Sequence, residues 1–195
     1  MKYLFAVLFI FPVIVLKSQT LHYGVKADLN LSNINGNGTS TSYIGGVQVG
    51  GFAEISLDKK WGLQPELLFT QSNTKKGDNF LVYYNTNGNY YAEDNIKLSY
   101  LNVPVLFRYN FSTALTLLAG PQIGFLLYDN ESLREDGKGA FKKYEVSGNA
   151  GLQFNISSVS LSARYNLGFS NINDIDNRYK WNSRHLQLGI AVRIR

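Results

Sequence analysis

The segment 185–194 constrains the fold more than any other part of the chain. Every second residue in it is aliphatic: Leu186, Leu188, Ile190, Val192 and Ile194. Because successive side chains of a β-strand point to opposite faces, this alternation predicts a strand with one purely aliphatic face. A strand that crosses a bilayer needs roughly 9–11 residues with its apolar side towards lipid. An open sheet edge cannot be satisfied in hydrocarbon, so the rest of the chain must supply the strands that close a barrel.

The same period of two recurs in seven earlier segments. They cover residues 23–31, 47–57, 61–70, 101–109, 115–127, 145–155 and 159–170. The connections alternate between long ones (32–43, 72–95, 129–143, 171–183) and short ones (58–60, 110–113, 156–158). Long external loops and short periplasmic turns are typical of outer-membrane barrels. The sequence therefore predicts an all-β fold, an eight-stranded antiparallel up-and-down transmembrane β-barrel with both barrel termini in the periplasm.

The first residues have the pattern of a secretory signal. Lys2 precedes an apolar run over 4–16, and Ser18 with Gln19 offers a small-residue cleavage zone. This pattern predicts a cleaved signal peptide over 1–19 and one outer-membrane barrel domain over 20–195. The absence of cysteine excludes a disulfide framework, a thiolate metal site and a lipid-anchored N-terminus.

Three prolines fall inside predicted strands: Pro65, Pro104 and Pro121. A proline removes a ladder hydrogen bond, and a closed barrel has no free edge to accommodate it. Because the three lie at broadly similar heights on neighbouring strands, we expect a local β-bulge there.

Alternation alone does not say which face points outward. A soluble lipocalin-like barrel would turn the apolar face inward around a ligand. Long, nearly unbroken aliphatic faces and a small, polar opposite face favour apolar side chains outward and a narrow filled interior. Aromatic residues also gather near strand ends, where membrane-interface girdles form: Tyr23, Trp61, Tyr109, Phe111, Phe125 and Phe169.

The charges on the polar face are balanced. There are four cations, Lys26, Arg108, Arg164 and Arg193, and four anions, Asp28, Glu54, Glu66 and Glu145. Single charges in a narrow, poorly hydrated interior are unfavourable, whereas paired ones are tolerated. These residues therefore predict a closed lumen with an ion-paired charge network. A narrow porin-like channel for small solutes is the alternative, because rings of charge can also select ions.

The loop 72–95 is the most distinctive exposed segment. An Asn-Gly pair lies between two aromatic runs, which predicts a protruding β-hairpin. Its candidate binding residues are Phe80, Tyr83, Tyr84, Tyr90 and Tyr91. Exposed tyrosines are common in protein interfaces. The alternatives are that they pair with one another across the hairpin or cover the barrel mouth. Besides outer-membrane lipid, the partner that the binding interpretation predicts is a protein at the extracellular loops.

Few residues of the chain are candidates for a catalytic or metal-binding site. His22 and His185 are the only imidazoles, and the predicted strands place them at opposite ends of the barrel. We therefore expect no enzyme activity, no cofactor and no metal. The alternative is an outer-rim enzyme in which His185 acts with Asp174, Asp176 or Ser183. The segment 173–176 lacks the spacing of an EF-hand and reads as a solvated loop.

The formal net charge of +5 comes from basic residues that are scattered along the chain. A nucleic-acid-binding face needs clustered basic residues, so no nucleic-acid partner is predicted. We expect a monomer.

The barrel segments resemble the PorT-like small outer-membrane β-barrel family of Gram-negative bacteria. The resemblance is carried by residues 23–27 (YGVKA), 62–68 (GLQPELL), 100–106 (YLNVPVL), 119–124 (AGPQIG) and 163–168 (ARYNLG). It implies that the in-strand prolines are family features, and it brings no catalytic residues. The founding member is associated with protein secretion and surface attachment, which would be the implied context for this chain.

Overall fold

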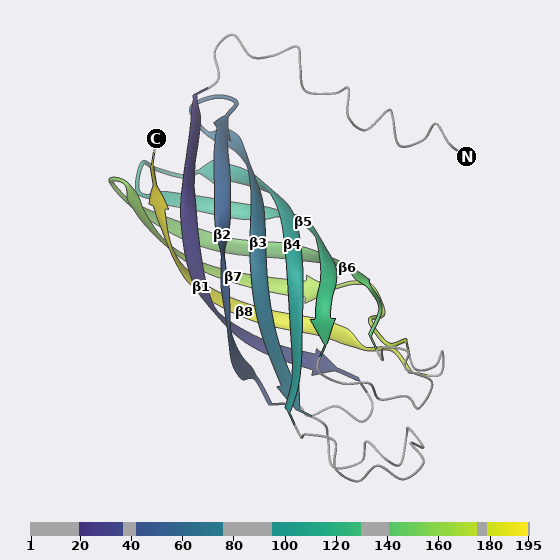
Figure 1. The fold of residues 1–195 in the computed structure, drawn as a ribbon. Coiled ribbons are helices and arrows are strands. Elements are labelled where there is room, and N and C mark those ends of the chain that lie inside the picture. Colours follow the sequence, from purple (N-terminus) through teal and green to yellow (C-terminus); the bar gives the residue numbers. More distant parts are fainter. Residues whose placement is uncertain (1–19, 37–41, 76–94, 130–140, 175–178, 195) are drawn as a thin grey trace, which may run out of the picture.

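The computed structural model describes residues 20–36, 42–75, 95–129, 141–174 and 179–194. These residues contain eight strands: β1 (Leu21–Asn35), β2 (Ile44–Ser56), β3 (Trp61–Lys75), β4 (Asn95–Asn110), β5 (Leu115–Asp129), β6 (Tyr144–Ile156), β7 (Val159–Gly168) and β8 (Asn182–Arg193). Each strand pairs antiparallel with its neighbours in the chain, and β1 also pairs with β8. The predicted eight-stranded up-and-down barrel is confirmed (Figure 1).

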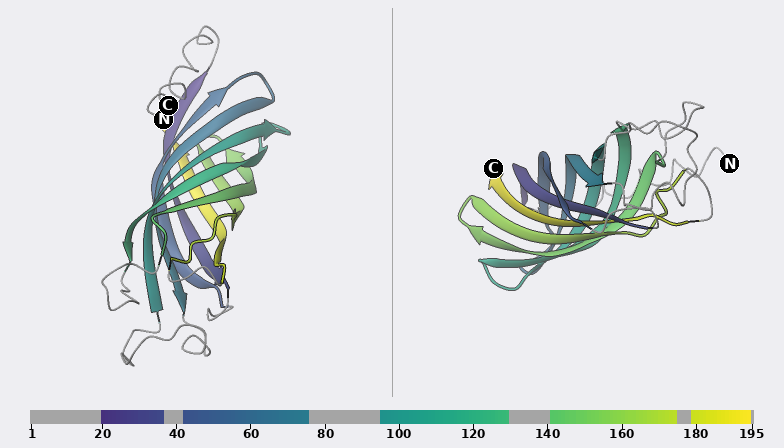
Figure 2. Two further views of the ribbon diagram at one scale, coloured as in Figure 1. Left: turned by 90° about the vertical axis from the view of Figure 1, so that its right-hand side faces the viewer. Right: turned by 90° about the horizontal axis from the view of Figure 1, so that it is seen from below.

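The predicted closing pair is also confirmed. Leu29 of β1 pairs with Val47 of β2 on one side and with Leu188 of β8 on the other. The strands run obliquely around the barrel (Figure 2), as closure of a sheet requires. We call the end with the connections 57–60, 111–114 and 157–158 the turn end, and the opposite end the loop end. The first residue of β1 and the last of β8 both lie at the turn end.

Several strands are longer than predicted. β1 continues to Asn35, β3 to Lys75, and β4 begins at Asn95. In the extensions of β1 and β3 polar side chains appear on both faces. In that of β4 the apolar Leu98 and Tyr100 face inward and Lys97 faces outward, so the outward apolar face that identifies a lipid-facing strand is absent. The backbone ladder nevertheless continues, for example between Lys75 and Asn95.

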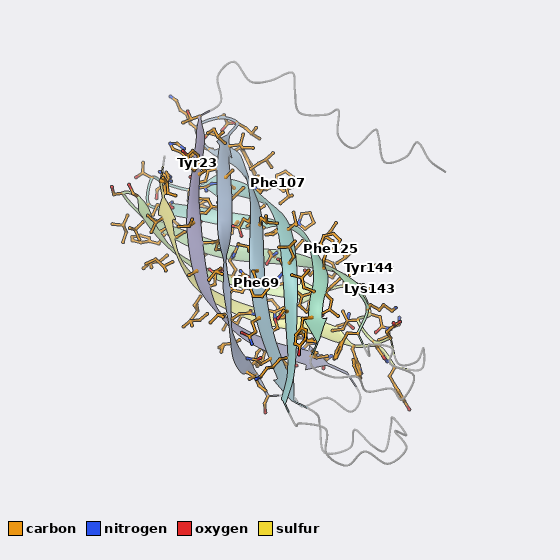
Figure 3. All side chains as sticks on the ribbon, in the orientation of Figure 1. Tyr23, Phe69, Phe107, Phe125, Lys143 and Tyr144 are labelled. Atoms are coloured by element: carbon orange, nitrogen blue, oxygen red, sulfur yellow. The ribbon has the colours of Figure 1, made fainter. Side chains whose placement is uncertain are left out.

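The apolar faces point outward. Leu29 and Leu188 are 64% and 49% exposed, whereas Asn30 and Gln48 on the other face are fully buried. Phe69, Phe107 and Phe125 project from the outer wall (Figure 3). This orientation excludes the lipocalin-like arrangement, because the apolar side chains line the outside of the barrel rather than a ligand cavity.

Aromatic side chains mark both ends of the outer wall. At the turn end the Trp61 and Tyr109 rings lie 4.7 Å apart, and the Tyr109 and Phe111 rings lie 5.1 Å apart. Nearer the loop end, Phe125 and Tyr144 are exposed on neighbouring strands. Aromatic girdles of this kind sit at the two membrane–water interfaces. Among the described residues, no helix is long and apolar enough to cross a membrane.

The predicted bulge at the prolines is wrong. Pro65 pairs with Val105, Pro104 with Gln122 and Pro121 with Gly148, and the register does not change at any of the three. A proline removes one hydrogen bond, but its fixed φ is compatible with an extended strand, so the register can continue past it. The register shift lies instead between Ser99 and Tyr100, towards the loop end of β4.

Candidate functional site

Four charged side chains meet inside the barrel. Arg164 from β7 reaches across to Glu66 of β3 (2.9 Å, Nη1 to Oε2) and to Asp28 of β1 (3.4 Å, Nη2 to Oδ2). Lys26 Nζ lies 3.2 Å from Asp28 Oδ2 and 3.5 Å from Glu66 Oε2. All four side chains are almost completely buried. We call Lys26, Asp28, Glu66 and Arg164 the central quartet; it joins three strands across the lumen and carries no net charge.

Neutral side chains add hydrogen bonds to both carboxylates of the quartet. Gln48 Nε2 donates a hydrogen bond of 2.6 Å to Asp28 Oδ2, and Gln64 Nε2 donates one of 2.6 Å to Glu66 Oε1. Gly189 leaves room for the aspartate, because a Cβ atom there would lie 1.6 Å from Asp28 Oδ1. Buried charges are tolerated where such additional hydrogen bonds satisfy them.

A second charge cluster lies near the turn end. Glu54 of β2 contacts two arginines: Arg108 of β4 and, at 2.9 Å, Nη2 of Arg193. Arg108 also donates a hydrogen bond to the Gln64 side-chain oxygen. Arg108 and Glu54 are buried, whereas the Arg193 side chain is 28% exposed. Two guanidinium groups therefore share one carboxylate.

Glu145 lies apart from both clusters. It is buried near the loop end of β6 and accepts a hydrogen bond from the Ser183 hydroxyl of β8. Within the described part of the chain it forms no ion pair. The eight predicted charges are thus divided into the quartet, a turn-end group with one excess positive charge, and a single carboxyl group near the loop end.

Apolar side chains also enter the lumen, between its polar groups. Leu68, Leu106 and Leu118 are at most 1% exposed, and Phe52 is 7% exposed. Their positions alternate with lipid-facing residues, so the period of two does place them inside. Gly120 allows the β4 backbone to approach β5 closely, because a Cβ atom there would lie 2.1 Å from the Val105 carbonyl oxygen. These side chains narrow the interior further.

A hydrophobic cluster lies across the loop end. It consists of Ile34, Leu98, Tyr100, Phe141, Ile172 and Trp181, and we call it the loop-end cap. The Phe141 and Trp181 rings lie 5.5 Å apart. Backbone hydrogen bonds from Lys142 N to Ile172 O and from Ile172 N to Trp181 O fix the loop segments that carry the cap. A cavity of about 10 Å³ beneath it has room for about one water molecule.

The two histidines lie at opposite ends of the barrel. His22 lines the turn-end opening, and His185 Nδ1 lies 3.0 Å from Ser32 Oγ near the loop end. Glu145 lines the same small cavity as His185, but its hydrogen bond comes from Ser183. In the described ranges, no group of three or more His, Cys, Asp or Glu side chains is placed to hold a metal ion.

The predicted binding hairpin lies outside the described residues. Phe80, Tyr83, Tyr84, Tyr90 and Tyr91 all fall in 76–94. Of the acidic loop 173–176, Asn173 and Asp174 are described, and Asn173 donates a 2.8 Å hydrogen bond to the Tyr179 carbonyl oxygen.

Comparison with solved structures gives outer-membrane barrels of the same fold. Neisserial surface protein A (NspA) matches with a TM-score of 0.53 and 14% identity, over 87% of this chain and 96% of that one. Ail, the attachment invasion locus protein of Yersinia pestis, solved with the heparin analogue sucrose octasulfate, matches with a TM-score of 0.53 and 13% identity, over 89% and 99%. At such identities the likeness shows the fold alone. A search of curated proteins found no match.

A family comparison covers most of the chain. Residues 17–174 match the outer membrane protein beta-barrel domain. Together with the lipid-facing aliphatic wall, this places the protein in the outer-membrane bilayer. The chain belongs to the outer membrane protein beta-barrel domain family.

Proposed function

We propose that the protein is a non-conducting, non-enzymatic outer-membrane barrel that binds partners or supports the envelope through its loop end. The observation that carries this proposal is the filled lumen. The central quartet joins the walls across the interior, and the loop-end cap covers one end. An eight-stranded barrel has little space beyond its own side chains.

The proposed function also implies which end of the barrel faces outward. The turn end, with both ends of the barrel domain, faces the periplasm after export guided by a signal peptide over 1–19. The loop end faces outward and carries the segments 36–43, 76–94, 130–143 and 169–181. The loop-end cap packs Phe141, Ile172 and Trp181, from the third and fourth of these segments, against the barrel wall, which supports a lumen closed at the loop end.

The candidate partner is a protein that contacts the second loop. Phe80, Tyr83, Tyr84, Tyr90 and Tyr91 would supply amphipathic contact area of the kind enriched at interfaces. A role in secretion or surface attachment, as in PorT-like proteins, would be one form of this binding. The barrel would then act as a monomeric anchor.

The test is a cross-linking pull-down from intact cells. The full protein is compared with a variant lacking residues 76–94 and with a matched variant lacking residues 130–140, another loop at the same end. We expect a cross-linked protein that disappears with the first deletion and persists with the second. Identical cross-linked proteins in all three samples would contradict a binding role for the second loop.

The competing channel function makes a different prediction. If the lumen conducts, the purified protein gives reproducible conductance steps in planar bilayers. The central quartet and the loop-end cap lead us to expect no steps for the wild-type protein. A rim enzyme is tested separately, because any activity that His185→Ala retains in full cannot depend on this imidazole.

A further inference from the structure

The turn end of the lumen opens into a wide cavity. Its volume is about 710 Å³. The walls come from the ends of β1, β2, β3, β4, β6 and β8 and from the short connections after β2, β4 and β6. In Figure 1 this opening lies at the upper end, where β1 begins and β8 ends. We call it the turn-end mouth.

The turn-end mouth is strongly biased towards positive charge. Lys59, Lys60, Arg108 and Arg193 line it, and Glu54 is the one carboxylate among its described lining residues. Glu54 already contacts both arginines. Glu54 offsets one of these four positive charges, and the neighbouring Asp58 carboxylate, which interacts with Lys60, offsets a second, so two positive charges remain in excess.

The arrangement places these charges at two depths. Arg108 is buried at the base, where Glu54 and Gln64 hold its guanidinium. Arg193 is 28% exposed beside it, and the two lysines lie on the exposed turn after β2. A concave opening with charges of one sign and low-dielectric walls concentrates the field and attracts counter-ions.

Near the opposite end of the lumen, the described lining residues include no Lys or Arg side chain. Glu145 is buried there without a cationic partner in the described part of the chain, under the apolar loop-end cap. The neutral central quartet separates the two ends. An anion is therefore attracted to the turn-end mouth and has no favourable path beyond it.

We propose that the turn-end mouth is a binding site for a small polyvalent oxyanion, a molecule that bears two or more carboxylate or phosphate groups. Guanidinium groups present paired N–H donors that match the oxygens of both groups. The volume is within the roughly 300–1,000 Å³ of small-molecule sites. A ligand with at least two negative charges would compensate this excess charge. This site is independent of the partner binding proposed for the loops.

The experiment measures binding of pyrophosphate and of citrate to the full chain in detergent micelles, by titration calorimetry at low ionic strength. Pyrophosphate represents the phosphate source of the ligand chemistry, and citrate represents the carboxylate source. The double variant Lys59→Gln/Lys60→Gln removes two charges from the mouth. The matched control, Lys142→Gln/Lys143→Gln, removes two adjacent lysines at the loop end, where Lys143 is visible in Figure 3.

We expect binding by the wild type that weakens about tenfold or more in the turn variant, a change of roughly 1.4 kcal/mol, and that stays unchanged in the control. Arg193→Gln is expected to weaken binding as well, because it removes the exposed guanidinium but leaves the Arg108–Glu54 pair. Heat-modifiable migration on gels checks that each variant is folded. Tighter binding of pyrophosphate would identify a phosphate-bearing ligand, and tighter binding of citrate would identify a carboxylate-bearing one. The proposal is overturned if neither probe binds, or if both double variants lose affinity equally.

Discussion

The connection between β6 and β7 consists of Ser157 and Ser158, and Ser157 has a φ of 56°. Of these two residues only Ser157 has a positive φ. A positive φ at the first central residue alone is the pattern of a type II′ turn, which prefers glycine at that position. A serine there is strained, because its Cβ atom approaches the following carbonyl oxygen.

We therefore expect Ser157→Gly to raise the free energy of unfolding by about 1 kcal/mol. Urea-induced unfolding in phospholipid vesicles measures it. Ser158→Gly is the matched control, because residue 158 has negative φ and gains nothing from glycine. Its free energy of unfolding is expected to stay the same or fall by about 0.5–1 kcal/mol. A Ser157→Gly barrel no more stable than the wild type would show that the turn is not strained.

Asp58 holds the turn between β2 and β3. Its Oδ1 atom accepts hydrogen bonds of 2.7 Å from the backbone N–H groups of Lys60 and Trp61. The Trp61 bond, followed by the Lys60 bond, lowers the pKa of the Asp58 carboxyl below its ordinary value. The folded state thus favours the ionised form. Its stabilising contribution is present above the pKa of the unfolded chain and is lost as the pH falls through the lowered folded pKa.

Asp58→Ala should therefore unfold at lower urea concentration than the wild type at neutral pH, and the difference should narrow below about pH 4. The measurement is the urea midpoint of both proteins between pH 7 and pH 2. Asp58→Asn keeps an oxygen acceptor but cannot titrate, so its difference from Asp58→Ala is expected to be independent of pH. A difference in urea midpoint between wild type and Asp58→Ala that stays constant with pH would contradict stabilisation of this turn by the ionised Asp58 carboxylate.

Among the elements, β1, β3 and β7 are joined by the central quartet. Arg164 contacts both carboxylates, at 2.9 Å from Glu66 and 3.4 Å from Asp28. Arg164→Met leaves two buried carboxylates with Lys26 alone. Removing one partner of a buried charge pair destabilises by about 3–5 kcal/mol, and we expect a loss of that size in urea unfolding.

The double variant Glu66→Met/Arg164→Met removes one charge of each sign and leaves Lys26 paired with Asp28. We expect it to recover much of the stability that the single variant loses. Arg193→Met is the matched single change, because Glu54 keeps its contact with Arg108, and it should lose clearly less. Equal losses for Arg164→Met and Arg193→Met would contradict a quartet that joins the strands.

The same elements show what the sequence can predict. The alternation in 185–194 and in 23–31 identifies β8 and β1 and their lipid-facing sides, because burial repeats with the period of the strand. It does not predict which luminal charges meet. Glu66 and Arg164 come from opposite walls, and their approach depends on strand tilt and register, which no local pattern encodes. For that reason Glu145 could not be separated from the other charges.

The predicted bulge and the loop-end cap differ from the structure for different reasons. A missing ladder hydrogen bond at Pro65 predicts a bulge, but the extended backbone keeps its register without that bond. The loop-end cap contains Ile172 and Trp181, which lie in a segment with no periodic pattern. The only sequence signal for it was the presence of large apolar residues in an otherwise polar loop.

At the scale of the whole molecule, charge is distributed along the barrel axis. The turn end has excess positive charge, the central quartet is neutral, and the loop end carries the buried Glu145 beneath an apolar cap. Balance over all eight luminal charges thus hides a polarity from one end to the other. This polarity supports an anion site at the turn end and opposes conduction through the centre.

The outer wall sets the position of the barrel in the bilayer. Leu188 lies mid-strand on β8, is 49% exposed and pairs with Leu29 and Ala163 on the neighbouring strands. Ile194 lies just beyond the turn end of β8 and is 63% exposed. A lysine facing lipid at the bilayer midplane destabilises a barrel by about 2–4 kcal/mol, whereas near the interface the loss is about 0–1 kcal/mol.

Leu188→Lys should therefore lose about 2–4 kcal/mol and Ile194→Lys about 0–1 kcal/mol of unfolding free energy in phospholipid vesicles. The two variants have the same charge and differ only in depth, so each controls for the other. In a lipid-free detergent of low hydrophobic thickness the difference should shrink, because the bilayer no longer defines the depth. Equal losses in vesicles would mean that the aliphatic face of β8 does not span the hydrocarbon, and the assignment of the outer wall to lipid would fail with it.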